Sequence, residues 1–321
     1  MEQKNGYLPG RLWLAPMAGV TDPAYRTICA ELGAEVTVTE MVSSRALVYQ
    51  DKKSRQLLPK NPGSICGVQI FGNDPDIMAE SAKIALEHSG CDFIDINMGC
   101  PMPKIANNGD GCGLMKEPAL AAKIVEKVAL AVPVPVTVKM RIGWDKGSIN
   151  CVELAKMVCD SGAQTIAVHG RTRSMLYSGT ADWDTIRKVK EAVNVPVIAN
   201  GDITSVLSAQ RCLTRSGADG LMVGRACFGD PWLFAELKAM LDGKEIPERP
   251  PLCQRVDVAE RQFELARQDK GEHIACLEAR KHFAWYLRGV AHSGYYKEQI
   301  AKISTMEDIH RIAAGIRRDL V

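Results

Sequence analysis

Short apolar segments that alternate with helix-like segments constrain the fold of this chain most strongly. Eight of them fall at residues 12–15, 35–38, 66–71, 93–96, 134–140, 165–168, 195–199 and 220–223. Near-continuous apolar runs are typical of parallel strands covered by helices. The pattern therefore predicts an α/β fold, a (β/α)8 TIM barrel over residues 1–242. A doubly wound open sheet is the alternative, but no glycine fingerprint of that class follows the first strand.

Proline and glycine mark the expected helix boundaries. Proline is favoured at the first helical position, and glycine is favoured just after the last turn. The expected starts are at Pro23, Pro75 and Pro118, and the expected ends are at Gly90, Gly162 and Gly217.

The pattern changes after residue 242. Residues 243–251 are polar and rich in proline, which is typical of a linker. Residues 252–321 show helical periodicity without strand candidates, so we expect a small all-α helical bundle there. This tail carries 12 Lys and Arg against 10 Asp and Glu, whereas residues 1–250 balance at 28 against 28. The excess is compatible with an anionic partner for the tail.

The remaining composition excludes several classes of protein. Residues 1–5 lead into no apolar stretch, and no run reaches the ~18 apolar residues of a membrane helix. We therefore expect no signal peptide, no membrane contact and a cytoplasmic location. Eleven cysteines without a C-x-x-C pair, and without histidines at zinc-ligand spacing, predict reduced thiols and no metal site. We expect a monomer rather than an oligomer.

The pentapeptide Asn97-Met98-Gly99-Cys100-Pro101 directly follows the fourth predicted strand. Barrel enzymes place their chemistry at the carboxyl ends of the strands. A thiol there can transfer a proton, and the Asn97 amide can orient a planar polar ligand. Cys112, in a glycine-rich stretch, is the nearest rival thiol.

Polar side chains and glycines occur at nearly every other predicted strand end. Because these ends converge on one face of a barrel, they predict a single site. Two members have simpler interpretations, since Gln69 could fill the barrel and His169 could be a capped structural histidine. The polar residues and glycines are Gln69, Lys139, Arg141, His169, Arg171, Asn200, Gly201, Asp202, Gly224 and Arg225, and the apolar Pro16 and Met17 end the first strand.

Lys139 closes an apolar strand, so its ammonium group should lie in or over the barrel mouth. A buried cation is costly unless it has a partner. Three interpretations stay open: a structural salt bridge to Glu40 or Asp95, a Schiff-base lysine, or a contact with an anionic cofactor ring.

The last two strands end in Asn200-Gly201 and Gly224-Arg225. Glycines there expose backbone N–H groups, and the next helix adds its positive N-terminal end. Together these features predict a phosphate site, to which Arg225 would add a charge-assisted contact.

Five ordered motifs carry a resemblance to a known family. They are APMAGVTD (15–22), DINMGCP (95–101), KMR (139–141), HGRTR (169–173) and NGD (200–202). With them the chain resembles the tRNA-dihydrouridine synthases, with the bacterial B-type branch most similar. The likeness runs in order from Arg11 to about Phe234, and the helical tail is also of the family's type.

The resemblance implies an FMN-dependent reduction of the C5–C6 double bond of uridines in tRNA, D-loop uridines above all. NADPH, or NADH, would act as the diffusible reductant. Cys100 would protonate C5 while the flavin delivers hydride to C6, and Asn97 and Arg171 would hold the substrate base. The implied cofactor-binding residues are Pro16, Met17, Gln69, Lys139, His169, Asn200, Gly201, Asp202, Gly224 and Arg225. A small residue would be expected in the family at position 112, where this chain has cysteine.

A tRNA base must be unstacked and flipped to reach a barrel mouth. On a helical wheel of residues 280–292, Lys281, Trp285 and Arg288 fall on one side, opposite an apolar side. A basic stripe with an aromatic residue suits RNA, so we assign these three residues to tRNA binding. The alternatives are a solvated face or a Trp285 that packs on the barrel. Five further cations could extend the surface: Lys270, Lys297, Lys302, Arg317 and Arg318.

Three rival functions remain open. A flavin barrel acting on a free pyrimidine, as in dihydroorotate dehydrogenases, would share Lys139, Asn97 and the phosphate glycines. An aldolase or isomerase would use Lys139 as a Schiff base. A non-catalytic RNA-binding protein would bind tRNA equally well without Cys100.

Overall fold

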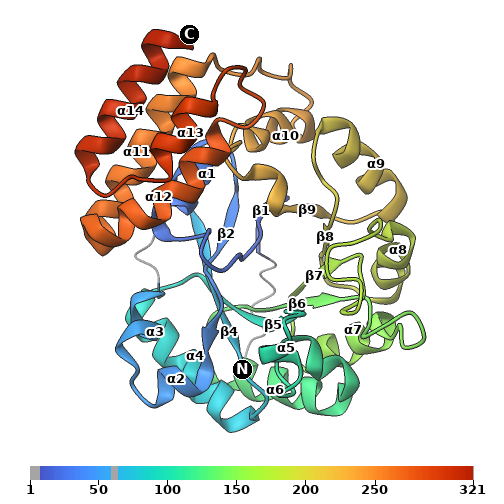
Figure 1. The fold of residues 1–321 in the computed structure, drawn as a ribbon. Coiled ribbons are helices and arrows are strands. Elements are labelled where there is room, and N and C mark those ends of the chain that lie inside the picture. Colours follow the sequence, from blue (N-terminus) through green and yellow to red (C-terminus); the bar gives the residue numbers. More distant parts are fainter. Residues whose placement is uncertain (1–7, 59–63, 321) are drawn as a thin grey trace.

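A closed barrel of parallel strands forms the larger part of the protein in a computed structural model, which describes residues 8–58 and 64–320 (Figure 1). The barrel closes where β2 pairs with β4, and a short ninth strand, β3, pairs only with β4 within these residues. Residues 1–5, considered above for a signal peptide, lie outside the described part of the chain. The strands are β1 (Leu12–Leu14), β2 (Val36–Val38), β3 (Val42–Ser43), β4 (Ile65–Phe71), β5 (Phe93–Met98), β6 (Val136–Arg141), β7 (Thr165–His169), β8 (Val197–Asn200) and β9 (Gly220–Val223). The predicted TIM barrel is confirmed.

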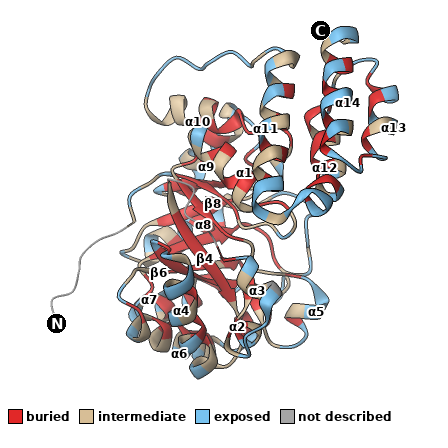
Figure 2. Cartoon of the chain, turned by 90° about the vertical axis from the view of Figure 1, so that its left-hand side faces the viewer, coloured by how far each residue is buried: buried red, intermediate tan, exposed pale blue. Residues whose placement is uncertain are grey.

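Helices surround the barrel and cover its outer wall. Figure 2 shows the strands buried at the centre, with the helices exposing their outer faces. An apolar core lies between the sheet and this layer of helices. The helical elements are α1 (Pro23–Glu31), α2 (Ser44–Val48), α3 (Lys52–Gln56), α4 (Pro75–Ser89), α5 (Pro103–Ala106), η1 (Gly111–Lys116), α6 (Pro118–Ala131), α7 (Cys151–Asp160), α8 (Trp183–Ala192), α9 (Val206–Ser216), η2 (Arg225–Cys227) and α10 (Leu233–Leu241).

Local sequence signals set many of these helix ends. The Asp22 carboxylate accepts a hydrogen bond from the Tyr25 N–H at 2.8 Å, so α1 begins at Pro23 as expected. Gly90 and Gly217 end α4 and α9 with φ of +60° and +62°, a conformation that glycine adopts at no steric cost.

The lower barrel interior is filled by apolar side chains. Trp13 and Phe93 meet there with ring centroids 5.6 Å apart, and a set of smaller residues packs around them. Gly67 lies against the Phe93 ring, so only a residue without a Cβ fits beside it. This packed layer forms the floor on which the cavity described below rests.

Four helices follow the barrel and pack around a second apolar core. They are α11 (Leu252–Lys270), α12 (Glu272–Tyr286), α13 (Gly294–Ile300) and α14 (Met306–Asp319). Figure 1 shows this group beside α1 and α10. None of the helices in the described ranges is both long and apolar enough to cross a membrane.

Polar and backbone contacts attach these helices to the barrel. The Arg261 guanidinium on α11 forms an ion pair with Glu31 at the end of α1. The Lys270 ammonium lies 2.5 Å from the Asp22 carboxylate. Gly229, with φ of +67°, lies against the Trp285 backbone, where an added Cβ would collide. The helical group is therefore held directly over one side of the barrel mouth.

The helical wheel expected over residues 280–292 is wrong. Helix α12 ends at Tyr286, and the chain turns through Gly289, with φ of +76°, and His292, with φ of +56°, before α13 begins. Arg288 therefore lies beyond the helix that carries Lys281 and Trp285.

Candidate active site

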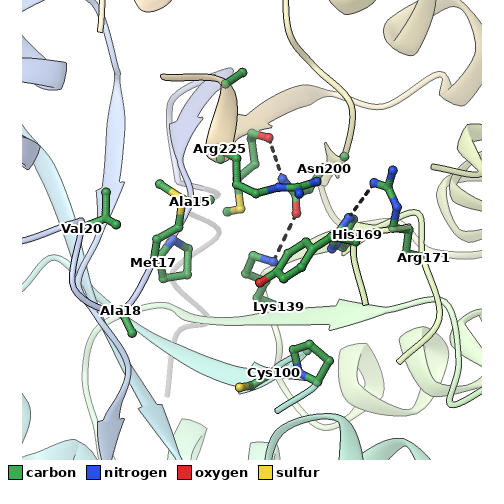
Figure 3. A pocket seen from close by; sticks show the side chains of 18 of the residues that line it. Ala15, Met17, Ala18, Val20, Cys100, Lys139, His169, Arg171, Asn200 and Arg225 are labelled. Atoms are coloured by element: carbon green, nitrogen blue, oxygen red, sulfur yellow. Dashed lines mark hydrogen bonds between the residues drawn. The ribbon is translucent and has the colours of Figure 1, made fainter. Parts of the chain in front are cut away.

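A cavity of about 800 Å³ opens at the carboxyl ends of the barrel strands (Figure 3). Helix α12 adds Lys281 and Trp285 to its wall. Arg288, which is exposed, is the one predicted site residue that does not line the cavity. The predicted residues that the fold brings together are Pro16, Met17, Gln69, Asn97, Cys100, Lys139, His169, Arg171, Asn200, Gly201, Asp202, Gly224, Arg225, Lys281 and Trp285.

Cys100 lies in the loop after β5, with its side chain partly buried in the cavity wall. Burial raises the pKa of its thiol, while the cations of Arg141 and Lys139 act in the opposite direction. The net rise keeps the thiol protonated at neutral pH. After loss of a proton, the same two cations would stabilise the thiolate.

Cys112 lies behind the Cys100 loop. Its N–H donates to the Cys100 carbonyl oxygen at 3.1 Å, and its side chain is fully buried. Burial raises the pKa of the Cys112 thiol to about 12. Cys112 therefore lacks both the access and the acidity of a catalytic thiol.

Lys139 projects from β6 into the cavity and donates to the Asn200 Oδ1 atom at 3.3 Å. Within residues 8–58 and 64–320 it forms no ion pair with a carboxylate, so the salt bridge to Glu40 or Asp95 is absent. Burial, with the nearby Arg141 cation, lowers the pKa of Lys139 to about 8. The ammonium group is partly buried, and Asp95 acts on it only from beyond ion-pair distance, so it fits a site that receives an anionic group.

Arg171 is held by other protein groups at the cavity wall. Its Nη2 atom lies 2.8 Å from both carboxylate oxygens of Asp202 and donates to the Gly179 carbonyl at 2.7 Å. Its Nε atom donates to the Ser178 carbonyl at 3.0 Å. Arg171 therefore uses these hydrogen bonds to hold the loop after β7 in its conformation. Burial and the surrounding cations lower the pKa of His169 well below its usual value, so its ring is neutral.

We expect Arg171→Met to lower the free energy of unfolding by about 2–4 kcal/mol, because the change leaves two carbonyls without their donor and Asp202 without its cation, with only the Ala181 N–H still donating to it. The Arg171 side chain is 3% exposed and that of Asp202 is 32% exposed, so solvent offsets part of the loss. Urea unfolding measures the effect. Arg187→Met removes a guanidinium that also donates to two carbonyls, but at an exposed position. A loss for Arg171→Met no larger than that of this control contradicts the assignment.

The ends of β8 and β9 form the predicted phosphate region. Asn200 donates to the Met222 carbonyl at 2.8 Å, which fixes its amide. Gly201 has φ of +115°, and an added Cβ there would lie 2.8 Å from the Ala181 Cβ. A Cβ added at Gly224 would meet only Met17 and Ala15, at ordinary contact distances of 3.7 and 3.8 Å. Arg225 follows it at the start of η2 and is exposed.

Among the cavity residues to which the sequence assigns no role, two carry polar or aromatic contacts that shape the site. Arg141 was noted at a strand end but received no role, although it donates to the Gly99, Thr172 and Leu176 carbonyls at 3.0, 2.9 and 2.7 Å. Tyr177 lies far from any strand end in the sequence, and its ring lies 4.3 Å from the Arg225 guanidinium. Only the fold of the loop after β7 brings it to the cavity.

The cavity wall from α12 is basic and aromatic. Trp285 stacks on Phe228 with ring centroids 4.3 Å apart, so it packs on the barrel and lines the cavity at the same time. The Lys281 ammonium donates to the Gly19 carbonyl at 2.8 Å. Three of the five cations considered as an extension of this surface are paired with carboxylates: Lys270, Arg317 and Arg318.

The residues present fit a flat, phosphate-bearing anion. Ala15, Pro16 and Met17 supply an apolar wall, Lys139 supplies an unpaired cation, and Gly224 with Arg225 supplies an open, basic end. In the described part of the chain, no group of three or more His, Cys, Asp or Glu residues is placed to hold a metal ion.

Comparison with known proteins identifies the family. The family model "Dihydrouridine synthase (Dus)" matches residues 13–317. A probable tRNA-dihydrouridine synthase of Rickettsia prowazekii is 44% identical over 297 residues, which is 91% of this chain and 90% of the relative. The tRNA-dihydrouridine synthase B of Pasteurella multocida is 41% identical over 298 residues, with coverage of 92% and 90%.

Solved structures share the barrel at low sequence identity. An old yellow enzyme homologue from Zymomonas mobilis aligns with a TM-score of 0.53 and 12% identity, over 74% of this chain and 90% of that one. Histamine dehydrogenase from Rhizobium aligns with a TM-score of 0.56 and 15% identity, over 79% of this chain and 49% of that one. At these identities the likeness concerns the fold alone. By its sequence over nearly the whole length, the chain belongs to the dihydrouridine synthase family of flavin-dependent oxidoreductases.

Proposed function

We propose that this protein reduces uridines in tRNA to dihydrouridine, with FMN as its cofactor and NADPH or NADH as the diffusible reductant. The observation that carries the proposal is one cavity in which Cys100, the unpaired Lys139 and the basic wall of α12 converge. The family match over residues 13–317 supports the same reaction.

The barrel residues would hold FMN. Pro16 and Met17 would lie against the ring, and Lys139 would lie near its N1 and O2 side, where reduced flavin carries negative charge. Gln69 would contact the pyrimidine edge, with His169 at a further flavin contact. The phosphate would bind among Asn200, Gly201, Asp202, Gly224 and Arg225. When bound, the reduced flavin supplies the hydride that C6 of the uracil accepts.

Cys100 would donate the proton to C5 of the uracil. Its raised pKa keeps the proton on Sγ until the substrate is in place. The resulting thiolate would lie near the Arg141 and Lys139 cations, which lowers the cost of the charge. A second proton from solvent would then restore the thiol.

The helices α11 to α14 would bind the tRNA, joined to the barrel by the linker 243–251. Trp285 and Lys281 would meet the flipped nucleotide and its backbone at the cavity wall, with Arg288 outside. Asn97 and Arg171 would border the base. Their amide and guanidinium groups are already hydrogen-bonded within the protein, so they would act chiefly through the loops that they hold.

FMN affinity should fall as the pH rises above 8. Free Lys139 has a pKa of about 8, and an anionic partner favours its charged form, so its pKa rises on binding. Below pH 8 the lysine is charged in both states and affinity stays flat. Above pH 8 binding must take up a proton, which costs at most about tenfold in affinity for each pH unit.

Quenching of flavin fluorescence between pH 7 and 9 measures this dependence. Lys139→Arg is the control, because its guanidinium stays charged over this range and its affinity should not vary. A flat profile for the wild-type protein would refute the contact with Lys139.

Flavin reoxidation tests the proposed function. The FMN-loaded protein is reduced by NADPH without oxygen and then mixed with tRNA that lacks dihydrouridine, with uracil, or with dihydroorotate. The proposal predicts rapid return of the flavin absorbance with tRNA alone. Reaction with a free pyrimidine and none with tRNA would favour the dihydroorotate dehydrogenase-like alternative.

A further inference from the structure

A buried chain of hydrogen bonds leads from the barrel interior to the Cys100 loop. It begins at Asp95 on β5, which is 2% exposed. The Asp95 carboxylate accepts from the Thr137 hydroxyl at 2.5 Å and from the Gln69 Nε2 atom at 2.6 Å. Burial raises the pKa of Asp95 to about 6, so the carboxylate is ionised at neutral pH.

The chain continues through two amides. The Gln69 Oε1 atom accepts from the Asn97 Nδ2 atom at 2.7 Å. The Asn97 Oδ1 atom accepts from the N–H groups of Gly99 and Cys100 at 3.1 and 2.9 Å. The amide of Asn97 is therefore used within the protein, at the base of the loop that bears the thiol.

The carboxylate fixes the direction of every later hydrogen bond. An ionised carboxylate only accepts, so Gln69 must present its NH2 group to Asp95 and its oxygen to Asn97. Asn97 must then present its NH2 group to Gln69 and its oxygen to the loop. Without the acceptor at position 95, either amide can rotate, and the two loop N–H groups lose a defined partner.

Other contacts hold the carbonyl side of this loop, and the Met102 N–H contacts the Cys100 sulfur. The Gly99 carbonyl accepts from Arg141 Nε at 3.0 Å, and the Cys100 carbonyl accepts from the Cys112 N–H at 3.1 Å. The N–H side depends on the Asp95 chain. A displacement of about 1 Å at a reacting group can lower the rate on the order of 100-fold. Loss of the hydrogen bonds to these N–H groups should therefore lower the catalytic rate.

We propose that Asp95 is a positioning residue for Cys100, acting through the Gln69 and Asn97 amides to hold the thiol in its orientation toward the cavity. The catalytic part of this inference rests on the proposed function, in which Cys100 donates a proton.

The test compares two substitutions of the buried carboxylate. Asp95→Asn keeps an oxygen that accepts from Gln69, so kcat should stay within about threefold of wild type. Asp95→Leu keeps the branching at Cγ but has no acceptor, so kcat should fall by about 10–100-fold with the KM for tRNA nearly unchanged. Thr165→Val is the matched control. Thr165 is a buried polar residue of the barrel, and its hydroxyl donates to the Gln164 carbonyl, outside the hydrogen-bond chain that begins at Asp95. It should keep the wild-type kcat.

A second measurement does not require turnover. The rate at which iodoacetamide alkylates Cys100 in the FMN-loaded protein reports the exposure and acidity of the thiol. Asp95→Leu should change this rate at least threefold, whereas Asp95→Asn and Thr165→Val should not. If Asp95→Leu does not fold, Asp95→Ala provides a smaller variant that also removes the acceptor, with the same expectations.

The outcomes separate this inference from the proposed function. A wild-type protein that does not reduce tRNA refutes the function, while the alkylation rates still decide whether Asp95 controls the thiol. Unchanged kcat and alkylation in flavin-loaded Asp95→Leu would overturn the inference. Equal losses of kcat in Asp95→Asn and Asp95→Leu would also overturn it, because the acceptor oxygen at position 95 would then not account for the loss.

Discussion

Cys100→Ala should lower the rate of uridine reduction in tRNA by about 10²–10⁴-fold, because the substitution removes the positioned proton donor. Flavin content should not change, since Figure 3 shows the thiol on the opposite side of the cavity from Arg225 in the proposed phosphate region. The measurement is the single-turnover rate of dihydrouridine formation with pre-reduced protein. Cys100→Ser should recover only part of the loss, because a hydroxyl is a much weaker acid. A rate for Cys100→Ala within about threefold of wild type would rule out this role.

Cys112→Ala provides the matched control for the Cys100 substitution. Cys112 is a neighbouring thiol that is fully buried, with a pKa of about 12. Its replacement should leave the reduction rate unchanged. Peptide mapping after brief alkylation should find the label on Cys100 and not on Cys112.

Lys139→Met should have opposite effects on flavin binding and on stability. Removing the cation should weaken FMN binding by about 10–100-fold, since a desolvated charge contact is lost. The flavin-free protein should become more stable at pH 7 by about 1–2 kcal/mol, because a partly buried ammonium group that forms no ion pair is replaced by an apolar side chain.

The pH dependence of the flavin-free protein follows from the same group. The pKa of Lys139 is lowered to about 8 on folding, so the unfolded chain holds more protons above pH 8. Stability should therefore increase as the pH rises above 8 in the wild-type protein, and this contribution should vanish in Lys139→Met. Urea unfolding at pH 7 and 9 measures both effects. A methionine variant that is less stable and binds FMN normally would contradict the account.

Much of the barrel could be predicted from sequence because its strands are buried on both faces. Such strands appear as continuous apolar runs, and eight were found. Their ends shifted by one or two residues, as at β6, which begins at Val136, just after Pro135. The two-residue strand β3 was not found, because Val42–Ser43 is too short to show a pattern.

Residues that directly follow strands could be placed at the cavity from the sequence, whereas residues on loops and on the tail helices could not. Tyr177 reaches the cavity only through the loop that Arg141 and Arg171 hold together. Charge partners were also not predictable, since the carboxylates that pair with Arg317 lie on another helix. The helical wheel over residues 280–292 assumes one continuous helix, but α12 ends at Tyr286 and Gly289 then turns the chain.

Mass spectrometry of tRNA tests the central claim most directly. Unmodified tRNA from cells that lack dihydrouridine is incubated with the FMN-loaded protein and NADPH, then digested and mapped. The account predicts a gain of two hydrogens on specific uridines, absent with Cys100→Ala. An FMN-loaded, NADPH-reducible protein that leaves every uridine unchanged would contradict it.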